Sequence, residues 1–125
     1  MHEIKMKRVY EEMDKADGYR ILVDRLWPRG VKKDDLPYDL WAKNITPSPG
    51  IRKAFNHEEE KFEAFKQNYR HELAENDEAS QFIEQVSEEL NHQNVTLLYA
   101  AKDEKINHVV LLKDWLEENI TDINE

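Results

Sequence analysis

The chain has 125 residues, a formal net charge of −9 and no cysteine. This length predicts one domain, residues 1–125, and the lack of cysteine excludes disulfides, thiolate metal sites and thiol nucleophiles. Because no apolar run is long enough to cross a bilayer and the N-terminus carries no export signal, we expect a cytoplasmic protein with no membrane partner.

The first half of the chain predicts two strands followed by an irregular segment. The strands cover residues 4–10 and 19–27, and Pro28 ends the second. The run Ile21-Leu22-Val23 is apolar on both faces, as in a central strand of a covered parallel sheet. Between residues 29 and 49 we expect a helical piece over 36–41 and a short fourth strand. Ser48 before Pro49 predicts that a helix begins there.

The second half predicts helices around one further strand. Apolar residues spaced three and four apart predict amphipathic helices over 58–74 and 79–90. A strand follows over 95–101, and Asn107 is a suitable N-cap for a last helix. Strands separated by helices imply right-handed crossovers. We therefore predict a small three-layer α/β fold with a short, mostly parallel central sheet and flanking helices.

Positive charge is concentrated where these strands end. Residues 1–53 contain 12 Lys or Arg and 9 Asp or Glu, whereas the remaining residues contain 6 and 18. Solvated acidic helix faces explain this asymmetry equally well. Basic side chains near strand ends nevertheless favour a compact anion as the ligand, since ligands of open α/β sheets bind beyond the carboxyl ends of the strands. The acidic net charge disfavours a nucleic acid partner without excluding one.

These observations predict an arginine-rich anion-binding pocket. Guanidinium groups bind phosphate or carboxylate through paired hydrogen bonds, and helix N-termini add amide donors. Asp24 and His108 are the candidate acid–base residues, since Asp24 lies among the final residues of the second predicted strand and His108 begins the helix that follows the last one. We predict no metal site and no cofactor. The predicted ligand-binding residues are Arg8, Arg25, Trp27, Arg29, Ser48, Arg52, Tyr99, Lys102 and Asn107.

Several of these residues also have a purely structural interpretation. Arg25 could cap backbone carbonyls, Asp24 could hold a helix N-terminus, and His108 could pack against the sheet. Trp27 could fill the core. The three glycines, at positions 18, 30 and 50, cannot build the glycine-rich loops that bind dinucleotides or nucleotide phosphates.

The stretch Asp17-Gly18-Tyr19-Arg20-Ile21-Leu22-Val23-Asp24-Arg25-Leu26-Trp27-Pro28-Arg29-Gly30 resembles the YeaO-like branch of the bacterial domain-of-unknown-function family 488 (DUF488). Further matches, among them residues 96–103 and Asn107-His108, extend the resemblance over residues 4–116. It implies a small α/β fold and a shared polar site built from the same arginines, but no particular activity. The broader family often has a Cys-His pair where this chain has Asn107-His108, which argues against thiol chemistry and keeps His108 as a candidate.

The sequence supports two functional hypotheses. In the first, the domain binds or processes a small phosphorylated ligand, such as a nucleotide or sugar phosphate. In the alternative, it is a non-catalytic module in which Arg25, Trp27 and Arg29 contact a protein partner or nucleic acid. Catalysis, substrate identity and oligomeric state are left open.

Overall fold

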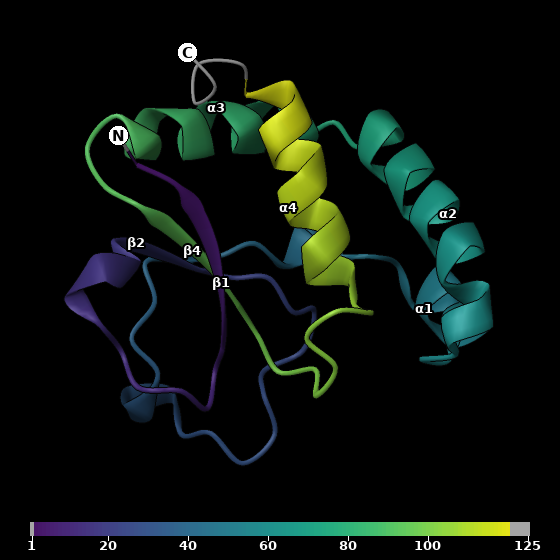
Figure 1. Ribbon diagram of the computed structural model, residues 1–125, viewed down its shortest axis with the longest axis horizontal. Coiled ribbons are helices and arrows are strands. Elements are labelled where there is room, and N and C mark those ends of the chain that lie inside the picture. Colours follow the sequence, from purple (N-terminus) through teal and green to yellow (C-terminus); the bar gives the residue numbers. More distant parts are fainter. Residues whose placement is uncertain (1, 121–125) are drawn as a thin grey trace.

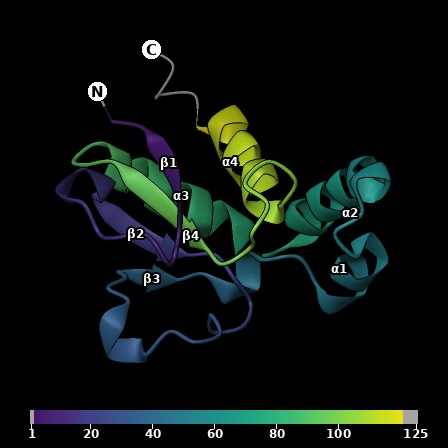
Figure 2. The ribbon, with the colours of Figure 1, turned by 60° about the horizontal axis from the view of Figure 1, so that its bottom comes forward.

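The computed structural model describes residues 2–120, which contain a four-stranded, entirely parallel sheet. Its strands are β1 (Ile4–Arg8), β2 (Tyr19–Leu22), β3 (Leu40–Trp41) and β4 (Val95–Tyr99). They lie in the order β1-β4-β2-β3, so the last strand of the chain is inserted between the first two (Figure 2). All four carboxyl ends therefore point to the same edge of the sheet.

The four α-helices of the described region lie on one face of the sheet. They are α1 (Pro49–Phe55), α2 (Phe62–Glu75), α3 (Ala79–Leu90) and α4 (His108–Asn119). Helix α4 packs on β1 and β4, α3 packs on β4, and α2 packs against α1 and α4 (Figure 1). No helix within residues 2–120 is long and apolar enough to span a membrane.

Side-chain alternation along the strands separates two layers of the core. In β4, Val95, Leu97 and Tyr99 join the large cluster formed with the helices. Leu98 points to the opposite face and joins a smaller cluster with Leu22 and with residues of the loops. The second covering layer therefore consists of the irregular segments 9–18 and 23–39, with their short 3₁₀ turns, rather than of helices.

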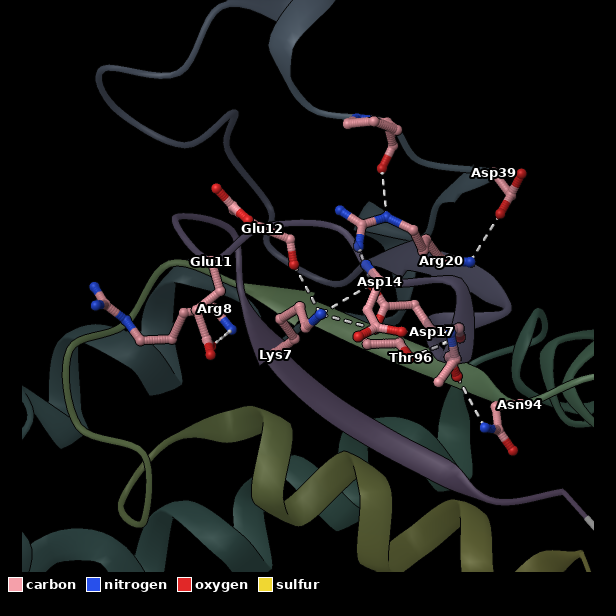
Figure 3. Close-up of polar contacts among 12 residues, drawn as sticks. Lys7, Arg8, Glu11, Glu12, Asp14, Asp17, Arg20, Asp39, Asn94 and Thr96 are labelled. Atoms are coloured by element: carbon pink, nitrogen blue, oxygen red, sulfur yellow. Dashed lines mark hydrogen bonds and ion pairs between the residues drawn. The ribbon is translucent and has the colours of Figure 1, made fainter.

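A buried ionic network stabilises this loop-covered face (Figure 3). The carboxylate of Asp17 is paired with the guanidinium of Arg20, and its Oδ1 lies 2.8 Å from Nζ of Lys7. Arg20 also donates to the carbonyl of Pro37, which anchors the loop before β3. Burial opposes ionisation of Asp17, but Lys7, the backbone N–H of Asp14 and Arg20 outweigh it and lower its pKa.

The predicted fold class is confirmed, and so is the short fourth strand, which is β3. The predicted helical piece over 36–41 is wrong, because this segment contains β3, and the nearest helical turn is the 3₁₀ turn Lys33–Asp35. The β2 backbone draws the segment into the sheet, since the N–H groups of Asp39 and Ala42 donate to the carbonyls of Arg20 and Leu22.

The predicted helices and caps agree closely with the structure. The expected helix over 79–90 is α3, and the expected helix over 58–74 is the 3₁₀ turn Glu59–Lys61 followed by α2. Helix α1 begins after Ser48 as predicted, with Pro49 in its first turn. Asn107 caps α4 by accepting from the N–H groups of Val109 and Val110.

Candidate functional site

A cavity of about 510 Å³ opens beyond the carboxyl ends of β2 and β4. Its walls come from the segment just after β2, the end of α1, the first turn of α2, the loop after β4 and the start of α4. The residues that line it are Asp24, Arg52, Phe55, His57, Phe65, Ala100, Ala101, Lys102, Asp103, Ile106, Asn107 and His108.

Asp24 and His108 separate β2 from β4 at the floor of this cavity. The last regular bond of the ladder runs from the Val23 N–H to the Leu98 carbonyl, at 3.0 Å. In a parallel pair, the next bond would run from the Ala100 N–H to the Val23 carbonyl. Instead, the Ala100 N–H donates to Asp24 Oδ2 at 2.9 Å, and the Val23 carbonyl accepts from His108 Nε2 at 2.6 Å. Two side-chain bonds thus replace one backbone bond.

This arrangement explains why both strands are shorter than predicted. The apolar pattern predicts strands through residues 27 and 101, but β2 ends at Leu22 and β4 at Tyr99. The backbone groups that would continue the ladder are satisfied by Asp24 and His108, so the strands diverge without leaving buried polar groups unpaired. The divergence creates the space of the cavity.

Burial changes the protonation of both floor residues. It raises the pKa of Asp24 to about 6, although the Ala100 N–H and the charge of Arg52 act in the opposite direction. It lowers the pKa of His108 to about 4, against the effect of the Val23 carbonyl. At pH 7 the carboxylate is therefore largely ionised and the imidazole is neutral. The 3.5 Å contact between His108 Nε2 and Asp24 Oδ1 is consequently not an ion pair at this pH.

The rim of the cavity is exposed and carries both signs of charge. Arg52 and Lys102 supply positive charge, and within residues 2–120 neither side chain makes a hydrogen bond or an ion pair. Asp103 supplies negative charge, and the N–H groups of Ile106 and Lys105 lower its pKa by donating to it.

The C-terminal end of α1 brings a further histidine to the rim. Asn56 and His57 both have positive φ angles, of 48° and 56°, which are uncommon for residues other than glycine. This turn reverses the chain after Phe55 and places His57 in the cavity lining. The ring of Phe55 stacks on that of Phe65, with the centroids 4.4 Å apart, and both form the apolar wall.

The structure brings five of the predicted site residues together in this cavity. They are Asp24, Arg52, Lys102, Asn107 and His108. The side chain of Asn107 is already committed, since its Oδ1 caps α4 and its Nδ2 donates to the carbonyl of Asp103. The other four retain polar groups that a ligand could contact.

The other three predicted arginines do not line the cavity. Arg8 donates to the carbonyls of Ala100 and Ala101, so it supports the cavity loop from outside. Arg25 donates to the carbonyls of Thr46 and Pro47 ahead of α1, which is the structural role considered for it above. Arg29 is exposed on the segment after β2. The positive charge of the cavity is accordingly smaller than the sequence suggested.

The remaining three predicted residues serve the packing of other regions. Trp27 donates from Nε1 to the carbonyl of Val31 and belongs to the loop-side cluster. Ser48 donates from both its hydroxyl and its N–H to the carboxylate of Glu72, which fixes α1 on α2. Tyr99 is buried in β4 among the residues that face the helices.

Sequence reasoning missed the wall of the cavity and part of its rim. Phe55 and Phe65 fit the pattern of an apolar helix face. This pattern is the same for a residue in the core and for one in a cavity wall. His57 precedes three glutamates, and this composition indicated only a polar surface. Asp103 follows β4 directly, so its position after a strand was a usable signal.

The fold and the site define a small α/β protein with a polar cavity at the carboxyl edge of a parallel sheet. The chain belongs to the DUF488 family, and residues 3–125 match the group described as the "Inactive DUF488-N3 subclade". This match, together with the identity to YeaO given below, confirms the resemblance to the YeaO-like branch.

The chain is similar to uncharacterised bacterial proteins. It is 47% identical to the uncharacterised protein YeaO of Escherichia coli over 113 residues, which cover 90% of this chain and 96% of YeaO. It is 43% identical to the uncharacterised protein Rv3073c of Mycobacterium tuberculosis over 70 residues, or 56% of this chain and 59% of that protein. No solved structure matches the chain significantly.

Proposed function

We propose that the cavity binds a small phosphorylated ligand, such as a nucleotide or sugar phosphate. The observation that carries the proposal is the pair of rim cations, Arg52 and Lys102, whose side chains make no hydrogen bond or ion pair within residues 2–120. A guanidinium can hold two phosphate oxygens through parallel bonds, and an ammonium adds a third contact from another direction.

The cavity's size and lining suit such a ligand. A volume of about 510 Å³ lies within the range of small-molecule sites. Phe55, Phe65 and Ile106 provide apolar contact for the organic part, while Asp24 and His108 provide polar contact at the floor. This combination of an apolar wall and a few convergent polar groups is typical of ligand pockets.

We propose binding rather than turnover as the principal role. The description of the matching subclade as inactive supports this choice. In addition, Asp24 and His108 each hold a backbone group that the sheet would otherwise satisfy, so movement of either side chain would leave that group unpaired. The predicted acid–base role is tested by incubating the protein with each binding ligand and measuring product formation.

The alternative of a protein-binding or nucleic-acid-binding module has less support. It required Arg25, Trp27 and Arg29 to face a partner. Arg25 and Trp27 instead donate hydrogen bonds to backbone carbonyls of their own chain, and of the three residues only Arg29 is exposed.

A thermal-shift titration with nucleotides, sugar phosphates and inorganic phosphate tests the proposal. A ligand that binds the native state raises the melting temperature by mass action. We expect Arg52→Gln to weaken binding at least about tenfold, because one charge-assisted contact is lost. Lys53→Gln is the matched control, since Lys53 is an exposed cation on the same helix outside the cavity lining.

Two results would refute the proposal. One is a panel in which no phosphorylated compound stabilises the protein. The other is a hit that Arg52→Gln and Lys53→Gln weaken equally, since this would place the binding site elsewhere.

A further inference from the structure

The floor of the cavity offers hydrogen-bond acceptors and almost no side-chain donors. Three polar side chains meet there, those of Asp24, Asn107 and His108. In Asn107, Oδ1 serves the α4 cap and Nδ2 donates one of its two hydrogens to the carbonyl of Asp103. The acceptors of the floor are therefore those of Asp24 and His108.

His108, which lines the cavity, carries an unpaired acceptor. Its Nε2 must carry the proton, because it lies 2.6 Å from the carbonyl oxygen of Val23, which can only accept. In the neutral ring the other nitrogen, Nδ1, then has a free lone pair. Among the residues that the structure describes, no group bonds to Nδ1. The burial that lowers the pKa of His108 to about 4 keeps this lone pair available at pH 7, although Arg52, His57 and Asp24 surround the ring.

Asp24 presents a second acceptor next to the first. Its Oδ2 accepts from the Ala100 N–H, which fixes the carboxylate plane. Its Oδ1 lies 3.5 Å from Nε2 of the His108 imidazole, so the carboxylate and the ring that carries the free Nδ1 are neighbours in the cavity lining. A ligand that enters must satisfy both, because a buried acceptor without a donor loses the hydrogen bonds that it makes to water.

We propose that the ligand carries two adjacent hydroxyl groups, as in the vicinal diol of a ribose, which donate to Asp24 and His108 while its phosphate binds Arg52 and Lys102. This inference rests on the proposed function and names the organic part of the same ligand. A hydroxyl suits this floor because it donates one hydrogen bond and can rotate toward its acceptor. A ligand that places carboxylate or carbonyl oxygens there would set acceptors against acceptors.

The 5-phosphoribosyl group combines these features, and it occurs both in free sugar phosphates and in nucleotides. The first test compares wild-type affinities for ribose 5-phosphate, 2-deoxyribose 5-phosphate and inorganic phosphate by calorimetry. We expect ribose 5-phosphate to bind at least about tenfold more tightly than the 2-deoxy compound, because the latter leaves one floor acceptor without a donor. Parallel measurements with AMP and 2′-deoxy-AMP tell which source of the group binds better.

The variant Asp24→Asn tests the role of the floor directly. Its amide oxygen can still accept from the Ala100 N–H, and its NH₂ group then replaces the free acceptor with a donor. We expect the ratio of the affinities for ribose 5-phosphate and 2-deoxyribose 5-phosphate to fall at least about tenfold. The ratio is the readout because the lost carboxylate interacts with Arg52, and any effect on phosphate binding is common to both compounds. Thermal melting monitored by circular dichroism checks that the variant folds. If it does not fold, the affinities of the wild-type protein for ribose 5-phosphate and 2-deoxyribose 5-phosphate decide whether the diol is recognised.

The outcomes separate this inference from the proposed function. If the ribose and 2-deoxyribose compounds bind with equal affinity, or inorganic phosphate binds as tightly as both, the diol is refuted and anion binding stands. If none of the phosphorylated compounds binds, the proposed function falls, and the diol with it.

Discussion

Asp24 and His108 should make opposite contributions to the pH dependence of folding stability. The pKa of Asp24 is raised in the folded protein, so the stability that it contributes is present below pH 3.8 and is lost as the pH rises through about 6. The pKa of His108 is lowered, so its contribution is present above pH 6.5 and is lost as the pH falls through about 4. Between pH 4 and 6 the two effects nearly cancel.

The size of each effect follows from the pKa values in the folded and unfolded states. For Asp24, the change from 3.8 to about 6 corresponds to about 3 kcal/mol of unfolding free energy. For His108, the change from 6.5 to about 4 corresponds to a similar amount, about 3 kcal/mol. Both groups are largely buried, so solvent screening reduces these values only modestly.

Replacing either side chain should therefore reveal the pH dependence of stability that the other side chain contributes. Relative to wild type, Asp24→Asn should gain about 3 kcal/mol of stability as the pH rises from 4 to 6.5, because only the His108 effect is left. His108→Gln should lose about as much over the same range. The measurement is urea denaturation of the three proteins in steps of half a pH unit, with the differences from wild type cancelling the effects of all other groups.

Parallel curves for the two variants would refute this reasoning. Such a result would mean that the two side chains are hydrated in the folded state and titrate near their ordinary pKa values. Direct titration of the His108 ring by NMR gives an independent check, and a midpoint above pH 6 would contradict the burial argument.

Three further predictions concern the fold. Asp17→Ala should cost about 3–5 kcal/mol in urea denaturation, because it leaves two cations without their buried partner, whereas Asp34→Ala, at an exposed site, should change stability by less than about 0.5 kcal/mol. Gly18→Ala should cost about 3 kcal/mol or more, since φ is +64° and the new Cβ would lie 2.1 Å from a backbone oxygen. Gly50→Ala, where nothing lies near the new Cβ, should be neutral or stabilising by up to about 1 kcal/mol. A smaller loss of stability at Gly18 than at Gly50 would contradict the geometry. Asn107→Ala should lower stability by about 1–2 kcal/mol and Asn107→Ser by less, because the serine hydroxyl still offers an oxygen that can cap α4; equal losses would argue against the cap.

Local signals in the sequence predicted the helices more accurately than the strand ends. The periodicity of α3 and the cap at Asn107 are decided by residues close together in the chain, so they could be recognised without coordinates. The strand ends could not. Val23, Leu26 and Trp27 suggest that the strand continues to residue 27, yet β2 ends at Leu22. Its ladder stops because His108, 85 residues away, donates to the carbonyl of Val23.

The candidate site also combines residues that the sequence could identify with residues whose role depends on the folded chain. The rule that ligands bind beyond the carboxyl ends of parallel strands selected Asp24, Lys102 and His108 from sequence alone, and the structure places all three at one cavity. The rule could not separate Arg52 from Arg25. Both are arginines near the same edge, but Arg25 meets backbone carbonyls and Arg52 meets the cavity.

By itself, the sequence determined the α/β class, the order of the main elements and the family, because these depend on periodicity, on capping residues and on a motif that spans residues 17–30. The tertiary structure alone decided which polar side chains face a cavity and which satisfy the protein's own backbone. The physical reason is that a buried carbonyl or N–H must find a partner, and whether that partner is a distant arginine, an aspartate or the next strand depends on distances that only the folded chain defines.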